Sequence, residues 1–158
     1  MNATRVASVE TFIVTLPRDT PYLGPLAPGE RIDARGYVVR KGNRTIYPTV
    51  DRSVLVKLHA ADGTVGWGET YGLVAPEAVT AIIDDVLAHQ VLGRDARDAE
   101  AIFDDLYGLM RVRGGSGGLG GDAMAAIDIA LWDLFGRATG QPVAALLGGL
   151  RRTRIPAY

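Results

Sequence analysis

The run from Asp122 to Gly149 constrains the fold more than any other part of this sequence, and it reads DAMAAIDIALWDLFGRATGQPVAALLGG. Its apolar residues return at steps of three and four, which is the period of a helix with one buried face. These residues are Ala126, Ile127, Ala130, Leu131 and Leu134. Asp122 is a favourable N-cap, while Gly136 and Gly140 weaken and then stop such a helix. Pro142 is suited to begin a second, short helix. The run therefore predicts a long buried helix that packs on other elements.

Size and composition exclude several classes of protein. The chain has 158 residues, no cysteine and a formal net charge of -1. This length predicts one domain and is too short for a complete (β/α)₈ barrel, which needs at least about 200 residues. Without cysteine, thiolate catalysis and zinc–sulfur sites are excluded. The near-neutral charge gives no electrostatic basis for binding nucleic acid or a membrane surface. With no signal-peptide pattern and no apolar run of about 18 residues, we expect a cytoplasmic protein.

The first half of the chain has the alternation of β-strands. Three segments show it, namely residues 5–16, 53–60 and 64–69. Asp62-Gly63 is a strong hairpin turn between the second and the third, which indicates an antiparallel meander. Residues 18–35 are rich in proline and glycine and predict a long loop, which in a compact domain is usually functional or disordered. A small hairpin is expected at residues 37–47.

After Gly72 the period changes to that of helices. One apolar stripe runs from Pro76 to Gly93, and Asp98 is suited to cap a following helix. The expected inner face of that helix consists of Ile102, Phe103, Leu106, Leu109 and Met110. The glycine-rich stretch 114–121 is expected to be a flexible connection to the long helix. Strands followed by helices predict an α+β domain, a three-stranded antiparallel meander followed by a helical bundle on one face.

Three patterns that can carry chemistry are weak here. The stretch from Gly115 to Gly120 matches the dinucleotide fingerprint G-x-G-x-x-G, but a helix and not a strand precedes it. Asp128 and Asp133 are five residues apart, which separates them by about 140° around a helix. We therefore expect no joint carboxylate site, and we expect at least one of the two to bond buried backbone or an arginine. His59 and His89 lie on separate elements, which favours structural or solvated roles over a metal site.

The order of elements and the run from Asp122 to Gly149 resemble the N-terminal capping domain of the enolase superfamily, in the mandelate racemase and muconate-lactonizing branch. The resemblance covers nearly the whole chain. It implies an enolase-like capping domain at residues 1–150 and, at residues 151–158, the start of a connection to a (β/α)₈ barrel that is missing from this chain. In that family the barrel holds the base, the acid and the three acidic metal ligands. The resemblance therefore implies no catalytic or metal residue here and Mg²⁺ in the complete enzyme.

In that family two loops of the capping domain close over the barrel mouth and select the distal end of the substrate. The corresponding segments here are residues 18–35 and the segment that follows residues 66–69. Arginine can grip a carboxylate with two hydrogen bonds, and tyrosine can donate to a sugar hydroxyl while its ring excludes water. Tyr158 would lie on the first barrel strand. The candidate substrate-binding residues are Arg18, Tyr22, Arg31, Tyr47, Arg52, Glu69, Tyr71 and Tyr158.

The resemblance also implies a reaction class for the complete enzyme. The family removes the proton α to a carboxylate, and magnesium stabilises the enediolate that forms. Because loops with arginine and tyrosine favour a polar acid-sugar substrate, we expect the specificity domain of a Mg-dependent acid-sugar dehydratase. A racemase or a cycloisomerase stays open, since the same intermediate leads to all three reactions. A stand-alone, non-catalytic binding or oligomerisation module is the alternative from another class. The expected partners are a small carboxylate, the missing barrel and further copies of the same chain.

Overall fold

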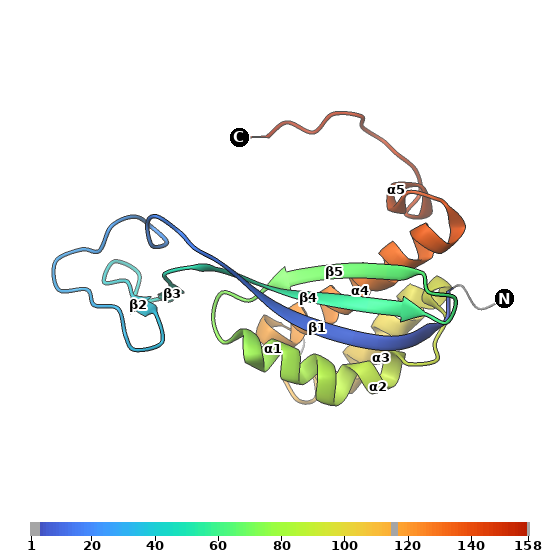
Figure 1. Cartoon of the computed structure of the whole chain (residues 1–158), viewed down its shortest axis with the longest axis horizontal. Helices are drawn as coiled ribbons and strands as arrows, with labels where there is room; N and C mark the ends of the chain where they lie inside the picture. Colours follow the sequence, from blue (N-terminus) through green and yellow to red (C-terminus); the bar gives the residue numbers. More distant parts are fainter. Residues whose placement is uncertain (1–3, 115–116, 158) are drawn as a thin grey trace.

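The computed structural model describes residues 4–114 and 117–157 (Figure 1). The strands are β1 (Val6–Leu16), β2 (Tyr37–Val39), β3 (Ile46–Pro48), β4 (Asp51–Ala60) and β5 (Val65–Tyr71). The α-helices are α1 (Pro76–Ile82), α2 (Ala88–Val91), α3 (Ala99–Arg111), α4 (Gly118–Thr139) and α5 (Val143–Leu146). A π-helical stretch (Ile83–Leu87) joins α1 to α2, and a short 3₁₀ turn (Ala96–Asp98) precedes α3. This arrangement confirms the predicted α+β fold.

The main sheet is the predicted antiparallel meander, with β4 between β1 and β5. Val54, Val56 and Leu58 of β4 point to the helices and are fully buried, and the residues between them are half-exposed. The pairing of β1 with β4 is irregular between Val6 and Ser8, which shifts the alternation of inward and outward side chains along β1. This shift explains why the alternation of the first strand is only partial in the sequence.

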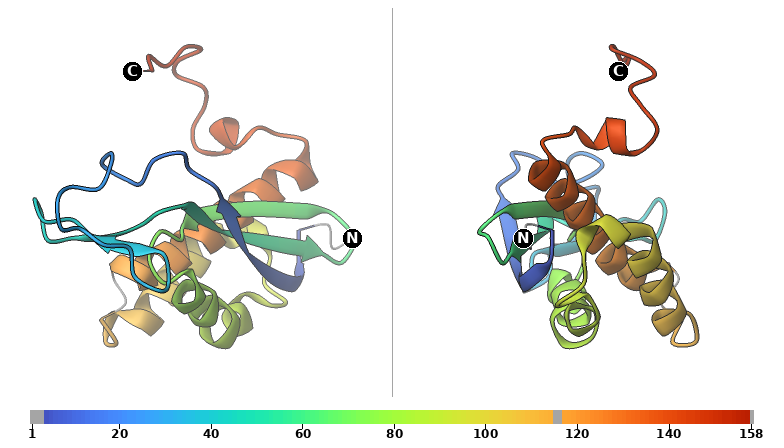
Figure 2. Two further views of the ribbon diagram at one scale, coloured as in Figure 1. Left: turned by 60° about the vertical axis from the view of Figure 1, so that its left-hand side comes forward. Right: turned by 90° about the vertical axis from the view of Figure 1, so that its right-hand side faces the viewer.

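The helices form the second layer. Figures 1 and 2 show α1 to α4 on one face of the sheet. The buried side chains of β4 and α4 belong to one hydrophobic core. The continuous helical stretch from Pro76 to Val91 ends at Gly93, which has a φ of +77°. Among the residues that the structure describes, no helix is both long and apolar enough to cross a bilayer.

Helix α4 lies unusually close to β5. A Cβ atom added at Gly66 would collide with the carbonyl oxygen of Ala130, and one at Gly68 with that of Ala126, so only glycine permits this approach. The Asp133 carboxylate accepts hydrogen bonds from the backbone N–H of Trp67 at 2.8 Å and from Arg137 Nε at 2.7 Å. This confirms the prediction that one aspartate of the pair bonds backbone or an arginine.

Four details of the helices differ from the sequence prediction. Helix α4 begins at Gly118 and not at Asp122, because α4 packs on α1 with Gly120 buried, which offsets the low helix propensity of glycine. Residues 118–121 are therefore helical and do not belong to a flexible connection, whereas Gly115 and Ser116 of the fingerprint motif lie outside the described residues. Leu109 is 44% exposed, since the core-facing stripe of α3 passes to Met110 instead.

The fourth difference concerns the cap of α3. Asp98 occupies the N-cap position, but its side chain makes no capping hydrogen bond. Asp95 accepts from the backbone N–H of Arg97 and so caps the preceding 3₁₀ turn. The cap therefore lies one turn earlier than predicted. At the other end of the helical layer, Gly140 stops α4 with a φ of +66°, as expected.

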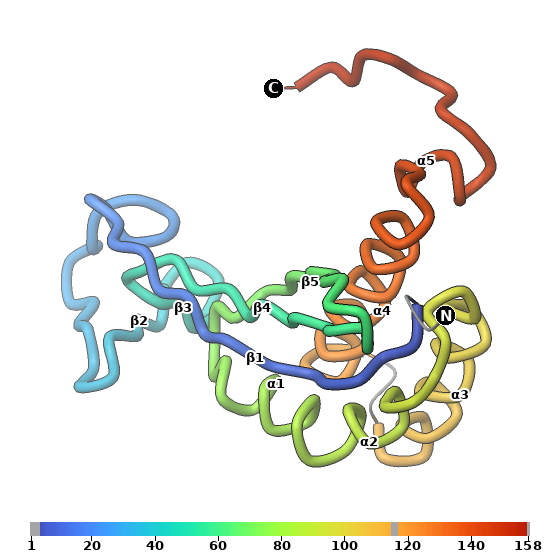
Figure 3. Tube along the Cα trace, turned by 45° about the vertical axis from the view of Figure 1, so that its right-hand side comes forward, coloured from blue at the N-terminus to red at the C-terminus, as the bar shows by residue number. Residues whose placement is uncertain are grey.

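Residues 17–50, which we call the distal loop, project from one end of the sheet (Figures 1 and 3). They contain the predicted small hairpin, formed by β2 and β3 as a separate two-stranded sheet. No residue of the distal loop belongs to the hydrophobic core between the sheet and the helices. The loop is therefore ordered by contacts of its own.

Candidate functional site

The two segments that carry the candidate residues leave the same end of the main sheet. Leu16 at the end of β1 pairs with Asp51 at the start of β4, and Tyr71 at the end of β5 pairs with Ser53. The backbone N–H of Gly72 donates to the carbonyl of Arg52 at 3.2 Å. The distal loop and the segment after β5 are therefore neighbours around the first residues of β4, and Figure 3 shows both at the same end.

Asp51 organises the first group of candidate residues. Arg18 Nη1 donates to both of its carboxylate oxygens, at 2.8 and 3.1 Å, and the Tyr22 hydroxyl donates to Oδ1. The Arg18 guanidinium also lies 4.1 Å from the centre of the Tyr22 ring. The charge of Arg18 is therefore already balanced by Asp51 of the same chain. In this arrangement Arg18 and Tyr22 act as one unit with Asp51.

The pKa values of the three groups follow from these contacts. The hydrogen bonds from Tyr22 and then from Arg18 lower the pKa of Asp51. The hydrogen bond to Asp51 raises the pKa of the Tyr22 hydroxyl and of the Arg18 guanidinium. At neutral pH the cluster therefore consists of an ionised carboxylate, a protonated phenol and a guanidinium.

Tyr47 extends this group by stacking. Its ring centre lies 6.2 Å from that of Tyr22, with 22° between the ring planes. Asn43 donates to the Tyr47 hydroxyl at 3.1 Å. Tyr22 and Tyr47 together form an aromatic surface with polar groups at its margin. Such surfaces bind the apolar faces and hydroxyls of small polar ligands.

Arg52 belongs to a second group, built on the hydroxyl of Tyr37. This oxygen accepts hydrogen bonds from Arg52 Nη1 at 2.8 Å and from the backbone N–H of Ala75 at 3.1 Å. Ala75 has a φ of +52°, a left-handed conformation that costs free energy for a residue with a side chain. Tyr37 thus links β2 of the distal loop to the segment between β5 and α1.

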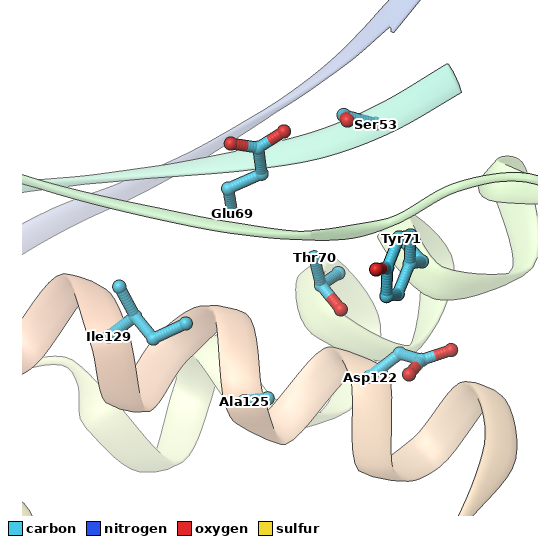
Figure 4. Close-up of a pocket in the computed structure, with 7 residues that line it drawn as sticks. All are labelled: Ser53, Glu69, Thr70, Tyr71, Asp122, Ala125 and Ile129. Atoms are coloured by element: carbon cyan, nitrogen blue, oxygen red, sulfur yellow. The ribbon is translucent and has the colours of Figure 1, made fainter. Parts of the chain in front are cut away.

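Glu69 and Tyr71 are among the residues of β4, β5 and α4 that line an open groove of about 680 Å³ along β5 (Figure 4). In Figure 4 Glu69 lies on the side of the strand away from α4, whereas Thr70 points toward the helix. Tyr71 is 74% exposed and is accessible to a ligand. Asp122 of α4 also lines the groove, and burial raises the pKa of its carboxyl.

The remaining two candidates are Arg31 and Tyr158. Arg31 is exposed in the distal loop, next to the isolated bridge between Ile32 and Val38, and none of the described residues bonds its side chain. Tyr158 lies outside the described residues. The structure therefore brings Arg18 and Tyr22 to the Asp51 carboxylate, stacks Tyr47 on Tyr22, and leaves Arg31 as a separate, exposed cation.

Sequence reasoning missed Asp51 and Tyr37, which organise the two groups. Asp51 precedes an apolar strand and Tyr37 follows a loop, and nothing local distinguishes them from surface residues. The only signal is their placement at predicted strand starts, since strand ends next to long loops often carry binding residues.

Within residues 4–114 and 117–157, no three carboxylate or imidazole side chains are grouped closely enough to hold an ion. His59 bonds Glu10 at 2.5 Å on the sheet surface, which is a local polar contact. We assign no chemical step on this chain to a metal.

Comparison with known proteins identifies the family. The sequence pattern of the mandelate racemase / muconate lactonizing enzyme N-terminal domain matches residues 42–148. The chain belongs to this family, as its resemblance indicated. It is 32% identical to the D-galactarolactone cycloisomerase of Agrobacterium fabrum over 98% of this chain and 35% of that protein. It is 37% identical to a D-galactonate dehydratase of Xanthomonas axonopodis over 72% of this chain and 29% of that protein. The chain thus spans about a third of the length of these curated relatives.

Solved structures agree with this assignment. The crystal structure of a candidate isomerase from Sinorhizobium meliloti is 64% identical, with a TM-score of 0.91, and the match covers 94% of this chain and 38% of that one. A mandelate racemase/muconate lactonizing protein from Paracoccus denitrificans, complexed with magnesium, is 30% identical with a TM-score of 0.67. That match covers 96% of this chain and 32% of the Paracoccus chain.

Proposed function

We propose that this chain is the substrate-specificity domain of an acid-sugar enzyme that abstracts a proton α to a carboxylate. The observation that carries the proposal is the meeting of the distal loop and the segment after β5 at one end of the sheet. The arginine and tyrosine side chains of these segments offer cationic, aromatic and hydroxyl groups, which suit a polyhydroxylated anion. The proposed substrate-binding residues are the eight candidates from the sequence, namely Arg18, Tyr22, Arg31, Tyr47, Arg52, Glu69, Tyr71 and Tyr158.

The domain boundaries and the cofactor are part of the same proposal. We assign residues 1–150 to the capping domain and residues 151–158 to the start of a connection to a (β/α)₈ barrel. The family resemblance implies that the metal ligands lie on the barrel, so residues of the barrel would hold Mg²⁺ in the complete enzyme. The magnesium in the Paracoccus structure supports this part. Cytoplasmic location and self-association of the complete enzyme remain predictions.

Two reactions compete within the acid-sugar class. A dehydratase agrees with the D-galactonate dehydratase relatives. A lactone cycloisomerase is favoured by a specific observation, because the match to the cycloisomerase covers 98% of this chain whereas the match to the dehydratase covers 72%.

The experiment is an assay of the full-length gene product that contains this chain. Aldonic acids, aldaric acids and aldarolactones are offered with Mg²⁺ and, in parallel, with a chelator. Loss of water from an acid identifies the dehydratase, and a lactone converted to a product of equal mass identifies the cycloisomerase. Turnover that survives complete chelation, or no turnover of any acid sugar, contradicts the proposal.

The isolated chain provides the second part of the test. The chain alone should not turn over any acid, because the proposed acid, base and metal ligands lie elsewhere. In the full-length protein, Tyr71→Phe and Arg31→Met should raise KM for the substrate more than they lower kcat, as expected for groups that bind its distal end. Unchanged KM in both variants would remove these residues from the candidate site.

A further inference from the structure

Arg40 is buried, with 5% exposure, although its side chain carries a charge. It directly follows β2, in the middle of the distal loop and away from the hydrophobic core. Burying a guanidinium costs free energy unless its donors are satisfied and its charge is paired. The surroundings of Arg40 therefore need to be polar and specific.

The donors of Arg40 are satisfied by the loop itself. Its Nε donates to the carbonyl of Tyr22 at 2.9 Å and its Nη1 to that of Pro25 at 3.1 Å. Its Nη2 donates to the carbonyls of Tyr22 and Gly24. The main chain of residues 22–25 thus curls around one planar guanidinium. Arginine suits this role because it presents five donors in a rigid fork, which lysine lacks.

The charge is balanced by Glu30, whose side chain is 3% exposed. Its Oε2 lies 2.7 Å from Arg40 Nη1. The carboxylate also accepts from the backbone N–H of Ala27 at 2.9 Å and of Lys41 at 2.8 Å. These backbone hydrogen bonds, followed by that from Arg40, lower the pKa of Glu30 to about 2. The ion pair therefore ties both halves of the loop together.

The chain conformation shows what the pair holds in place. Leu23, Gly24 and Gly29 all have positive φ angles, of 68°, 95° and 75°. For Leu23 this region is unfavourable, so it persists only where surrounding contacts impose it. Here those contacts are the hydrogen bonds of Arg40 to the carbonyls on either side of Leu23.

Arg40 reaches the candidate site through Tyr22. Arg40 donates to the backbone carbonyl of Tyr22. The Tyr22 side chain bonds Asp51 and stacks on Tyr47, and the Arg18 guanidinium lies over the Tyr22 ring. The backbone position of Tyr22 therefore sets the position of the whole aromatic and cationic group.

We propose that the buried Arg40–Glu30 pair is a positioning device that folds residues 22–30 before substrate arrives, and so presents Tyr22 and Arg18 to the distal end of an acid sugar. The proposal rests on the proposed function for its kinetic consequence and on the structure alone for the ordering of the loop. Preordering favours binding because the loop does not lose conformational freedom when the ligand binds.

The ordering is tested by hydrogen exchange on the full-length protein. In Arg40→Met, amides of residues 22–30 should exchange about tenfold faster or more, while those of β4 and α4 stay protected. Arg113→Met removes an exposed arginine elsewhere and is the matched control. Glu30→Gln keeps the shape but loses the charge, and it should loosen the same amides less strongly. Unchanged exchange of residues 22–30 in both variants overturns the proposal.

The kinetic consequence is tested by variants at the same position. Arg40→Ala should raise KM for the acid sugar by about tenfold or more with a much smaller change in kcat, since the residue positions binding groups and touches no reacting atom. Arg40→Lys should recover only part of the loss. Millimolar guanidinium should lower the KM of Arg40→Ala, and the same concentration of sodium chloride or urea should not.

The outcomes separate this proposal from the proposed function. If the wild-type protein turns over no acid sugar, the proposed function fails, and the exchange experiment still decides whether Arg40 orders the loop. If the wild-type protein is active and Arg40→Ala loosens the loop without changing KM, the positioning role is wrong. A fall in kcat alone, with no rescue by guanidinium, also contradicts it.

Discussion

The main sheet with its helices and the distal loop are stabilised in opposite ways. The sheet and helices share a continuous apolar core in which the side chains of β4 are fully buried against α4. The distal loop contributes nothing to that core and folds around a buried guanidinium and its carboxylate partner. Hydrophobic burial is insensitive to direction, whereas hydrogen bonds to a guanidinium require defined positions of each acceptor.

This difference indicates which sequence changes each region can tolerate. A core held by apolar contacts accepts changes of its surface but few changes of volume. A loop held by a few polar contacts can change its surface and its length, and it depends on the residues at its centre. Four of the candidate substrate-binding residues, Arg18, Tyr22, Arg31 and Tyr47, lie on the second kind of structure, whereas Arg52, Glu69 and Tyr71 lie on strands of the main sheet. The family fold can therefore stay the same while the loop varies.

The largest effect is expected in the core, at Gly68. Gly68→Ala places a Cβ against the carbonyl oxygen of Ala126 and forces α4 away from β5. We expect a loss of about 3 kcal/mol or more in unfolding free energy, measured by denaturant unfolding. Gly42→Ala in the distal loop is the control, since an added Cβ meets open space there. It should change stability by less than about 0.5 kcal/mol. Equal losses in the two variants would contradict the close-packing argument.

Lowering the pH should loosen the distal loop before it loosens the core. The pKa of Glu30 lies at about 2 in the folded protein against an ordinary value of 4.5. Because the folded-state pKa is lowered, the stabilisation is fully present above about pH 4.5 and is lost as the pH falls toward 2. Amides of residues 22–30 should therefore lose protection in this range before those of α4. In Glu30→Gln this acid-dependent step should disappear. Simultaneous loss of protection in loop and core would show that the two regions are not independent.

Removal of the Tyr37 hydroxyl should have a smaller effect. Tyr37→Phe leaves Arg52 and the N–H of Ala75 without their common acceptor. A loss of about 1 kcal/mol is expected, together with faster exchange of the Ala75 amide. Tyr107→Phe on the exposed side of α3 is the matched control and should change neither quantity. No change at Ala75 would mean that Tyr37 does not link the loop to the segment before α1.

The smallest effect concerns the Asp51 cluster and leaves the melting temperature unchanged, because the ion pair is solvent-exposed. Asp51→Asn removes the interaction that raises the pKa of Tyr22, so that pKa should fall toward its ordinary value. Ultraviolet absorbance detects the tyrosinate, and the difference from Tyr22→Phe assigns the signal. Asp84→Asn removes a carboxylate that bonds Thr11 on the opposite part of the sheet and should not alter the titration. An unchanged titration in Asp51→Asn would mean that the phenol does not bond this carboxylate.

Most of the fold was predictable because it depends on periodic patterns. The alternation of Val54, Val56 and Leu58 specifies a half-buried strand, and the spacing of Ala126 to Leu134 specifies a helix against it. The family followed from the same run. The start of α4 was misplaced because glycine is a poor helix former in isolation and only tertiary packing makes residues 118–121 helical.

The candidate site was less predictable because its contacts are not local. The sequence indicated which loops carry arginine and tyrosine, and the roles of those side chains remain predictions. Nothing in the sequence indicated that Arg40, after three strand residues, is buried, or that Asp51 binds Arg18 across 33 positions. Such contacts depend on how the loop folds back, and neither periodicity nor propensity contains that information.

The separate construction of the distal loop has a consequence for protein engineering. Residues 17–50 leave the sheet through two strand ends and hold their shape by the internal Arg40–Glu30 pair. A segment of this kind can be transplanted between relatives as one cassette, provided that its outside anchors are kept. These are the carboxylate at position 51 and the two partners of the Tyr37 hydroxyl, which are Arg52 and the backbone N–H of Ala75. New ligand preferences could then be introduced without redesigning the scaffold.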